Sequence, residues 1–345
     1  MPEITPKHRH PGTLTVSIVI PGYNCAGTIK RCLESVLTQD YPHIIQIIFV
    51  DDGSQDATPS VVSSFDRVQY IRQANAGPAH ARNRGAAAAT GSLIAFIDAD
   101  CIAHSDWITN LVSCFTANTI GAATGRYGLA NPQSLLARCI HQEIIYRHKR
   151  YSAREIRFFG SYNVCLPKDV FENVGGYDSQ YRRASAEDND LSYRLSKWGY
   201  KICYESRAVV DHYHPERLIK YLSEQYVHGY WRAQLYRTHP GMMRGDDYTF
   251  WKDILETLLA LFVLALGLMV MMAPPVILTI AGIAVLFLSL LEIFFGWRIM
   301  HQTRAGLCFA WVMFWRSFAR AIGFMHGGLS FITLTLPDSR ETGST

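Results

Sequence analysis

The stretch Val16-Ser-Ile-Val-Ile-Pro-Gly-Tyr-Asn24 decides the fold, because a short apolar run passes directly into a turn. The apolar runs at 44–50 and 93–97 end in the same way, in Asp51-Asp-Gly-Ser54 and in Asp98-Ala-Asp100. Runs of this length indicate buried strands, and the segments between them repeat apolar residues at helical spacing. This alternation is typical of an α/β domain built on a mostly parallel, Rossmann-like sheet.

The domain predicted from this alternation covers residues 14–210. We expect strands at 16–20, 44–50, 68–71, 93–97 and 208–210, and helices at 26–38, 58–65 and 79–89. Ligands of parallel α/β sheets bind at the carboxyl ends of the strands. The sequence therefore places the functional site where the turns after three of these strands meet.

The composition of the 345 residues narrows the class of protein. The 33 Lys and Arg against 29 Asp and Glu give a formal charge of only +4, so we expect no nucleic-acid partner. Charged residues make up only 18%, which excludes disorder for most of the chain. The eight cysteines show no Cys-x-x-Cys pair, which favours reduced thiols facing the cytosol over a zinc site or a disulfide framework.

The apolar excess lies in a region, 251–336, that we expect to be bound to a membrane. Residues 254–273 and 276–295 are each long enough to cross a hydrocarbon core of about 30 Å. Pro274 and Pro275 between them predict a tight turn, and therefore a transmembrane hairpin. Basic residues flank both outer ends, so the positive-inside rule places these ends and the preceding domain in the cytoplasm. We expect a multi-pass protein of the plasma (inner) membrane.

Three segments flank this hairpin. Residues 211–250 are aromatic and basic, which fits an amphipathic region at the bilayer interface as well as an ordinary helix packed on the domain. Residues 307–323 are apolar but contain Arg316 and Arg320, which favours an interfacial or re-entrant helix over a third membrane span. Residues 337–345 form a polar tail.

Two acidic clusters at the strand ends suggest the chemistry. Asp51 and Asp52 can accept hydrogen bonds from a nucleobase or ribose, as acidic residues do in dinucleotide folds. Asp98 and Asp100 are two positions apart, so on an extended segment both carboxylates would share one face and suit a hard divalent cation. Each cluster alone is common, whereas both in one α/β domain favour a nucleotide-diphosphate site with a metal ion.

With these motifs the sequence resembles the family 2 glycosyltransferases, which are inverting, nucleotide-sugar-dependent enzymes of the GT-A fold, in a membrane-anchored form typical of bacteria. The resemblance covers residues 14 to about 215 and rests on six elements that occur in the family's order. These elements are Val16–Asn24, Phe49–Ser54 with Asp56, Ala81–Gly85, Phe96–Asp100, Gly160–Asn163 leading to Val174–Asp178, and Glu187–Leu191 with Arg194 and Leu195.

The resemblance implies roles for individual residues. The implied donor-binding residues are Pro21, Tyr23, Asp51, Asp52, Arg82, Asn83 and Asp98. Asp100, together with Asp98, would hold Mg²⁺ or Mn²⁺ against the diphosphate. His212 and His214 are further candidates for the metal or the diphosphate, with interface histidines that take no part in chemistry as the equal alternative. Asp188, with Glu187 beside it, takes the place of the catalytic base.

The base role of Asp188 also has a physical argument. Inversion at an anomeric carbon requires the acceptor hydroxyl to lose its proton as it attacks opposite the leaving diphosphate. Asp188 comes just before a helical pattern, and a helix N-terminus favours the ionised carboxylate that a base must be. The plain alternative is that Glu187, Asp188 and Asp190 are first-turn acids of an ordinary helix. The upstream motifs favour the base.

The expected function is the transfer of a single sugar from a UDP- or GDP-linked donor to a membrane or lipid-linked acceptor in glycan or cell-envelope biosynthesis. Processive relatives carry a Gln-x-x-Arg-Trp motif, and the segment from Gln225 to Trp231 lacks it. One alternative is a metal-dependent nucleotidyltransferase. Such an enzyme would be expected to have a basic phosphate-binding loop after the first strand, and the turn there contains no Lys or Arg before Lys30. The other is a non-catalytic membrane scaffold, which the intact acidic residues disfavour.

Overall fold

The computed structural model describes residues 13–149, 155–244, 251–269, 275–301 and 304–333. The chain forms two compact units, one of residues Met1–Gln133 with Ile144–His214, and one of Ser134–Glu143 with Pro215–Thr345. We call the first the sheet unit and the second the helical unit, and the division between them falls inside helix α5.

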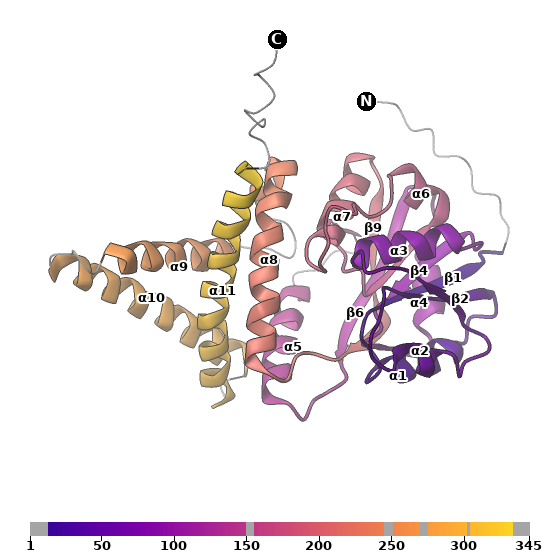
Figure 1. The fold of residues 1–345 in the computed structure, drawn as a ribbon, viewed down its shortest axis with the longest axis horizontal. Helices are drawn as coiled ribbons and strands as arrows, with labels where there is room; N and C mark the ends of the chain where they lie inside the picture. The colour runs from indigo at the N-terminus through magenta and orange to yellow at the C-terminus, as the bar shows by residue number, and fades with distance from the viewer. Residues whose placement is uncertain (1–12, 150–154, 245–250, 270–274, 302–303, 334–345) are drawn as a thin grey trace, which may run out of the picture. The chain divides into compact units, whose positions relative to one another are not determined.

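The sheet unit contains a nine-stranded sheet and short helices (Figure 1). Its strands are β1 Val16–Gly22, β2 Ile44–Asp51, β3 Gln69–Arg72, β4 Leu93–Ile97, β5 Cys101–Ala103, β6 Ile120–Leu129, β7 Glu155–Ile156, β8 Asn163–Pro167 and β9 Lys201–His212. Its helices are α1 Ile29–Leu37, α2 Thr58–Val62, α3 Pro78–Ala88, α4 Trp107–Val112, α6 Lys168–Asn173, α7 Glu187–Lys197 and the end of α5 Leu135–His148.

The sheet has the order β3-β2-β1-β4-β8-β6-β9-β5, with β7 paired to β9. The first four strands run parallel, with Val19 of β1 between Ile48 of β2 and Phe96 of β4. Strand β8 then pairs antiparallel with β4 and β6, while β6 and β9 are parallel. The prediction of an α/β fold is confirmed, and the continuous parallel part of the sheet is β3-β2-β1-β4.

Apolar residues cover both faces of the sheet because neighbouring residues of a strand point to opposite sides. Ile18 belongs to the cluster that packs under α1, α2 and α4, whereas Val19 belongs to the cluster under α3, α6 and α7. Helix α3 approaches the sheet closely, since a Cβ at Gly85 would lie 2.3 Å from Cγ1 of Val19. The strand ends, and with them the site, are thus held by two packed layers of helices.

The predicted strands and helices of the first hundred residues agree with the observed ones within a few residues. The predicted strand at 208–210 was too short, because β9 runs from Lys201 to His212. His212 is therefore the last residue of a strand and does not follow it.

The helical unit contains the first turns of α5 and four long elements. These are α8 Leu218–Thr238, α9 Trp251–Met269, α10 Pro275–Ile299 and α11 Ala305–Thr333, with a 3₁₀ helix at Pro240–Arg244. Helices α8 and α11 lie side by side (Figure 1). Glycines allow this approach, because a Cβ at Gly323 would lie 2.0 Å from the carbonyl oxygen of Tyr226 and one at Gly327 would lie 2.3 Å from that of Tyr230.

The segments predicted to be bound to a membrane lie in the helical unit, and they agree with its helices only in part. Among the described residues, α10 alone is long and apolar enough to cross a membrane. The predicted span 254–273 corresponds to α9 up to residue 269, and its remainder lies outside the described residues, as does Pro274 of the predicted turn. The segment 307–323 is not a separate short helix, because α11 continues to Thr333. The polar tail 337–345 also lies outside the described residues.

Candidate functional site

Asp51 is the last residue of β2, and its carboxylate is fully buried. Its Oδ1 accepts a hydrogen bond from the N–H of Ser54 at 2.7 Å, and its Oδ2 accepts one from the hydroxyl of Tyr70 at 2.5 Å. Burial raises the pKa of Asp51, but these hydrogen bonds and the Arg72 guanidinium together outweigh burial and hold the pKa below its ordinary value. Asp51 is therefore an ionised group fixed inside the turn after β2.

Asp52 follows Asp51 and binds the loop in front of α3. Its Oδ1 accepts hydrogen bonds from Nε2 of Gln73 at 2.6 Å and from the N–H of Ala76 at 2.9 Å, and its Oδ2 accepts one from the N–H of Gly77 at 2.9 Å. Gly77 has φ +95°, a conformation that favours glycine. Both acids of this pair thus shape the turn around the site, and their contact with a nucleobase stays a prediction.

The two acids after β4 have different partners. An extended segment was expected, but residues 98–101 form a turn in which the N–H of Cys101 donates to the carbonyl of Asp98 at 3.1 Å. Asp98 Oδ1 accepts a hydrogen bond from Arg82 at 2.7 Å, whereas Asp100 lies beside His212. The turn therefore gives the two carboxylates different partners.

Arg82 of α3 lies between two acidic segments. Its side chain is only 2% exposed, and its second terminal nitrogen donates to Oε1 of Glu187 at 2.9 Å. The guanidinium also lies over the ring of Tyr177, 5.4 Å from its centre. The two carboxylates raise the pKa of Arg82 further, despite its burial, so the group is a permanent cation. Arg82 joins the turn after β4 to the start of α7.

Glu187 and Asp188 are the first two residues of α7 and differ in exposure. Glu187 is buried, with its Oε2 accepting from the N–H of Ser185 at 2.7 Å. Asp188 is partly exposed, and its Oδ1 accepts from the N–H of Asn189 at 2.8 Å. Of the two, Asp188 has the solvent access that a base acting on an incoming hydroxyl needs.

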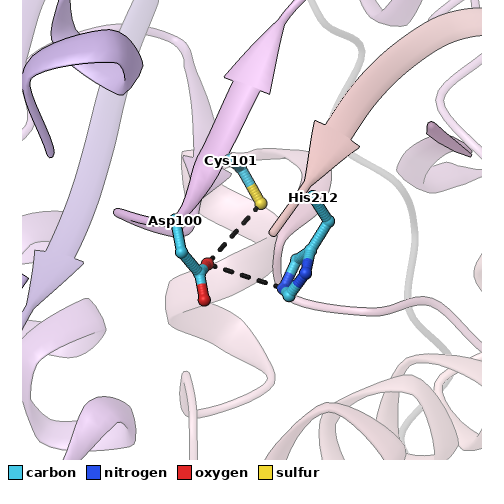
Figure 2. Close-up of side chains that lie close together, drawn as sticks. All are labelled: Asp100, Cys101 and His212. Carbon is cyan, nitrogen blue, oxygen red and sulfur yellow. Dashed lines mark hydrogen bonds and ion pairs between the residues drawn. The ribbon is translucent and has the colours of Figure 1, made fainter. Parts of the chain in front are cut away.

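Asp100, Cys101 and His212 form a group that meets the spacing of metal ligands (Figure 2). Oδ1 of Asp100 lies 3.5 Å from Nε2 of His212, a separation that suits two neighbouring ligands of one cation at about 2.1 Å each. Asp100 is about half exposed, while Cys101 is buried with a pKa raised well above its ordinary value by burial. The carboxylate and the imidazole therefore fit Mg²⁺ or Mn²⁺, and the protonated thiol does not.

The remaining predicted residues are His214, Asp98, Pro21, Tyr23 and Asn83. The buried ring of His214 packs against His212, with 5.0 Å between ring centres, and neither His214 nor Asp98 belongs to the metal-type group among the described residues. Pro21 is buried in β1, and Tyr23 is exposed at its end. Asn83 holds the backbone of Tyr177, accepting from its N–H at 2.9 Å and donating to its carbonyl at 2.7 Å.

Two tyrosines of the site were missed by the sequence interpretation. Tyr70 lies on the edge strand β3, and nothing in its sequence surroundings marks its bond to Asp51. Tyr177 stands within the quoted motif Val174–Asp178 but received no role, and it is buried against Arg82. Its hydroxyl has no hydrogen-bond partner in the described part of the chain.

Similar proteins are known for most of the chain. Residues 17–177 match the family described as Glycosyl transferase family 2. Glycosyltransferase AglE of Haloferax volcanii is 27% identical over 203 residues, which are 57% of this chain and 66% of the relative. Poly-beta-1,6-N-acetyl-D-glucosamine synthase of Staphylococcus epidermidis is 26% identical over 272 residues, which are 75% of this chain and 62% of that protein. The chain thus spans about two thirds or less of the length of these relatives.

A solved structure shares the fold. The mannosyltransferase PcManGT from Pyrobaculum calidifontis, in complex with GDP-Man and Mn²⁺, superposes with a TM-score of 0.59 at 19% sequence identity. The match covers 93% of this chain and 88% of that chain. At this level of identity the likeness establishes the GT-A-like architecture.

Proposed function

We propose, from the match of residues 17–177 to glycosyltransferase family 2, that this chain is a member of the family and transfers one sugar from a nucleotide-diphosphate donor to an acceptor, with inversion at the anomeric carbon. The observation that carries the proposal is the bridge through Arg82, which brings the acidic turn after β4 next to the start of α7. A donor-side acidic turn and a partly exposed carboxylate are thereby held within one site. The relatives named as glycosyltransferases support the same reaction class.

The residues divide the work as follows. Asp188 accepts the proton of the acceptor hydroxyl as that oxygen attacks, and the start of α7 keeps the carboxylate ionised. Asp100 and His212 would hold a divalent cation, which would supply positive charge to neutralise the departing diphosphate. Tyr23 and the turn around Asp51 receive the nucleoside of a UDP- or GDP-linked donor. The complex of PcManGT with GDP-Man and Mn²⁺ is consistent with this class of donor and metal.

We further propose that the protein is bound to a membrane and faces the cytoplasm. Helix α10 has an exposed apolar surface, and only 17% of its most apolar window is buried, as expected of a helix in contact with lipid. The apolar residues exposed on it include Val276, Ile283, Leu286, Leu290 and Phe294. An acceptor at the bilayer, such as a lipid-linked glycan, would explain why the enzyme is anchored there. A multi-pass arrangement with α9 as a second span belongs to this proposal.

The test is nucleotide binding and donor turnover by the full-length protein in detergent. UDP, GDP and CDP are compared with Mn²⁺ and with chelator, and the best binder is repeated with Asp100→Asn and Asp188→Asn. We expect metal-dependent binding that Asp100→Asn weakens, and transfer that Asp188→Asn lowers about 10³-fold while binding is kept. No nucleotide binding by folded protein would contradict the transferase and favour a scaffold. Binding without transfer in the wild type, across lipid-phosphate acceptors, would contradict the proposed acceptor class.

A further inference from the structure

Hydrogen bonds from side-chain oxygens join the segments that follow the first two strands of the sheet. We call residues 23–28, between β1 and α1, the β1 turn, and residues 52–58, which follow β2, the β2 turn. Three consecutive N–H groups of the β1 turn, those of Asn24, Cys25 and Ala26, donate to side chains of the β2 turn. The acceptors are Oγ of Ser54 at 2.9 Å, Oγ1 of Thr58 at 2.8 Å and Oδ2 of Asp56 at 3.1 Å. The two turns are thus fixed to one another over three successive residues.

Asn24 is bonded to the β2 turn in both directions. Its N–H donates to Ser54, and its own Oδ1 accepts from the N–H of Gln55 at 2.8 Å. Its φ of +50° lies in the left-handed region, which asparagine tolerates better than most residues with a side chain. Asparagine therefore meets two requirements at this position, the backbone conformation and the acceptor oxygen.

The bonds continue from Asn24 to the buried end of β2. The N–H of Ser54 donates to Oδ1 of Asp51 at 2.7 Å, and its carbonyl accepts from Nη2 of Arg72 at 2.9 Å. Ser54 is itself buried, and it is held through its N–H, its carbonyl and its hydroxyl. A chain of bonds thus runs from the Asp51 carboxylate through Ser54 to Asn24, the residue next to Tyr23.

The β1 turn is better suited to a nucleoside than to a phosphate. Free N–H groups in front of a helix commonly bind anions. The N–H groups of residues 24–26 already donate to side chains, and one of the acceptors is the carboxylate of Asp56, which would repel a phosphate. The side chain that this turn presents to solvent is that of Tyr23, which is 48% exposed. An aromatic ring in this position can stack on a nucleobase.

We propose that Asn24 is a positioning residue, which holds Tyr23 in place for the nucleoside of the donor through its bonds to the β2 turn. The proposal deepens the function proposed above and rests on it, since that function assigns Tyr23 to the nucleoside. Asn24 itself makes no contact with the donor in this proposal. A ring that is fixed before the nucleotide arrives loses less conformational entropy on binding, so the bonds of Asn24 raise the affinity.

The experiment measures the Kd of UDP and of GDP, each with Mn²⁺, for the full-length protein in detergent by calorimetry. Asn24→Gly removes the carboxamide but keeps the left-handed backbone free of strain. We expect its Kd to rise about tenfold, with the Mn²⁺ concentration for half-maximal binding within about twofold of wild type. Asn24→Asp keeps an acceptor oxygen and the tolerance for positive φ, so its Kd should stay within about threefold of wild type.

Ser54→Ala distinguishes positioning from direct contact. This change removes the acceptor of the Asn24 N–H and leaves Asn24 in place, so positioning predicts a Kd that rises about fivefold. The double variant with Asn24→Gly should rise only about tenfold, because both changes break the same connection between the turns. In donor turnover, the KM should follow the Kd in each variant while kcat stays within about twofold of wild type.

Ser92→Ala is the matched control. Oγ of Ser92 accepts from the N–H of Thr15 at 3.0 Å, which is the same kind of bond at the opposite end of β1. We expect it to lower the unfolding temperature and to leave the Kd of both nucleotides unchanged. If Asn24→Gly does not fold, Ser54→Ala breaks the same connection from the β2 turn and decides the question.

The outcomes separate this inference from the proposed function. An unchanged Kd in both Asn24→Gly and Ser54→Ala would overturn the inference. A rise confined to Asn24→Gly would make Asn24 a direct ligand of the nucleotide and would also overturn it, as would an equal rise in Ser92→Ala. A folded wild-type protein that binds neither nucleotide would instead refute the proposed function, and with it the assignment of Tyr23.

Discussion

A buried arginine in each unit binds two carboxylates from distant segments. Arg82 of the sheet unit is 2% exposed and joins Asp98 to Glu187. Arg316 of α11 is 1% exposed and joins Glu143 of α5 to Glu256 of α9, the latter at 2.6 Å. Their local geometry is alike, and their surroundings are not.

The two bridges differ in how exposed the carboxylates bound by Arg82 and by Arg316 are. Asp98 is 28% exposed and belongs to the turn of the site, so one end of the Arg82 bridge is open to solvent and ligand. Glu143 and Glu256 are 10% and 2% exposed, between helices that are otherwise apolar. A buried ion pair is by itself weak evidence that the pair stabilises the fold, so the role of each bridge is inferred from the surroundings of its carboxylates. The Arg82 bridge thus borders the candidate site, whereas the Arg316 bridge lies inside the helical unit and links its helices.

The helical unit extends the Arg316 bridge into a network at one end of α9 and α10. Lys252, at the start of α9, binds Glu256 and also Glu292 of α10 at 3.0 Å. Arg320 binds Asp253 at 3.3 Å and Gln225 of α8 at 2.8 Å. The arginines that seemed too costly for a membrane helix are thus paired with acids. The network therefore joins α5, α8, α9, α10 and α11 near the start of α9.

The largest expected effect is the loss of stability in Arg316→Leu. This change removes Arg316 from the buried Glu143 and leaves Glu256 with Lys252 as its described cation, and it should lower the free energy of unfolding by about 3–5 kcal/mol. Thermal unfolding of the full-length protein in detergent measures it. The triple variant Arg316→Met, Glu143→Gln and Glu256→Gln removes the charges together and should recover to within about 1 kcal/mol of wild type. An unchanged unfolding temperature in Arg316→Leu would remove the assembly role from the comparison.

Arg82→Leu should destabilise less, although the bond geometry is similar. Asp98 can regain water when Arg82 is lost, so only Glu187 remains as a buried uncompensated charge, and we expect about 2–3 kcal/mol. The same thermal unfolding experiment compares both arginines on one scale. Equal losses in Arg82→Leu and Arg316→Leu would show that the exposure of Asp98 does not matter.

The sequence predicts the parts of this picture that depend on local pattern. The apolar runs of β1, β2 and β4 and the acids that follow them are visible without a structure, because buried strands and their end turns have local signals. Strands β6 and β8 have no such signal. The need for a glycine at position 125 of β6 depends on the neighbouring strand β9, because a Cβ at Gly125 would lie 1.9 Å from the carbonyl oxygen of Ala208.

The contacts that organise the site are long-range, and the sequence does not predict them. The acids at 98, 100, 187 and 188 are recognisable as candidates, but their partners depend on a turn and on α3. Asp98 and Asp100 look equivalent in sequence, and the turn at 98–101 gives one to Arg82 and the other to His212. Burial likewise distinguishes Glu187 from Asp188, which adjoin in sequence.

His212→Gln should separate function from stability more completely than either arginine. His212 lies 3.5 Å from Asp100 and has no ion pair with another buried group among the described residues, so its loss should cost about 0.5 kcal/mol or less. The Mn²⁺ concentration for half-maximal nucleotide binding should rise about tenfold. His104→Gln is the control. Nε2 of His104 lies 3.3 Å from Oδ2 of Asp211, the residue before His212 in β9, and His104 is not part of the metal-type group. Equal Mn²⁺ dependence in both variants would exclude His212 as a ligand.

The remaining prediction concerns Asp51, a buried carboxylate whose partner Tyr70 is neutral. Tyr70→Phe removes the hydroxyl that donates to Asp51 at 2.5 Å and should cost about 1.5 kcal/mol at pH 7. Since the pKa of Asp51 is held below the unfolded value of about 3.9, this stabilisation is complete above that pH and is lost as pH falls through the folded pKa. Thermal unfolding at pH 7, 5 and 3 should therefore show the difference from wild type shrinking only at the lowest pH. Tyr41→Phe, whose hydroxyl donates to the neutral carbonyl of Leu14 at 2.6 Å, should show a constant difference. If both variants respond equally to pH, the charge of Asp51 does not carry the effect, and a bond to a buried carboxylate then stabilises this fold no more than a bond to the backbone.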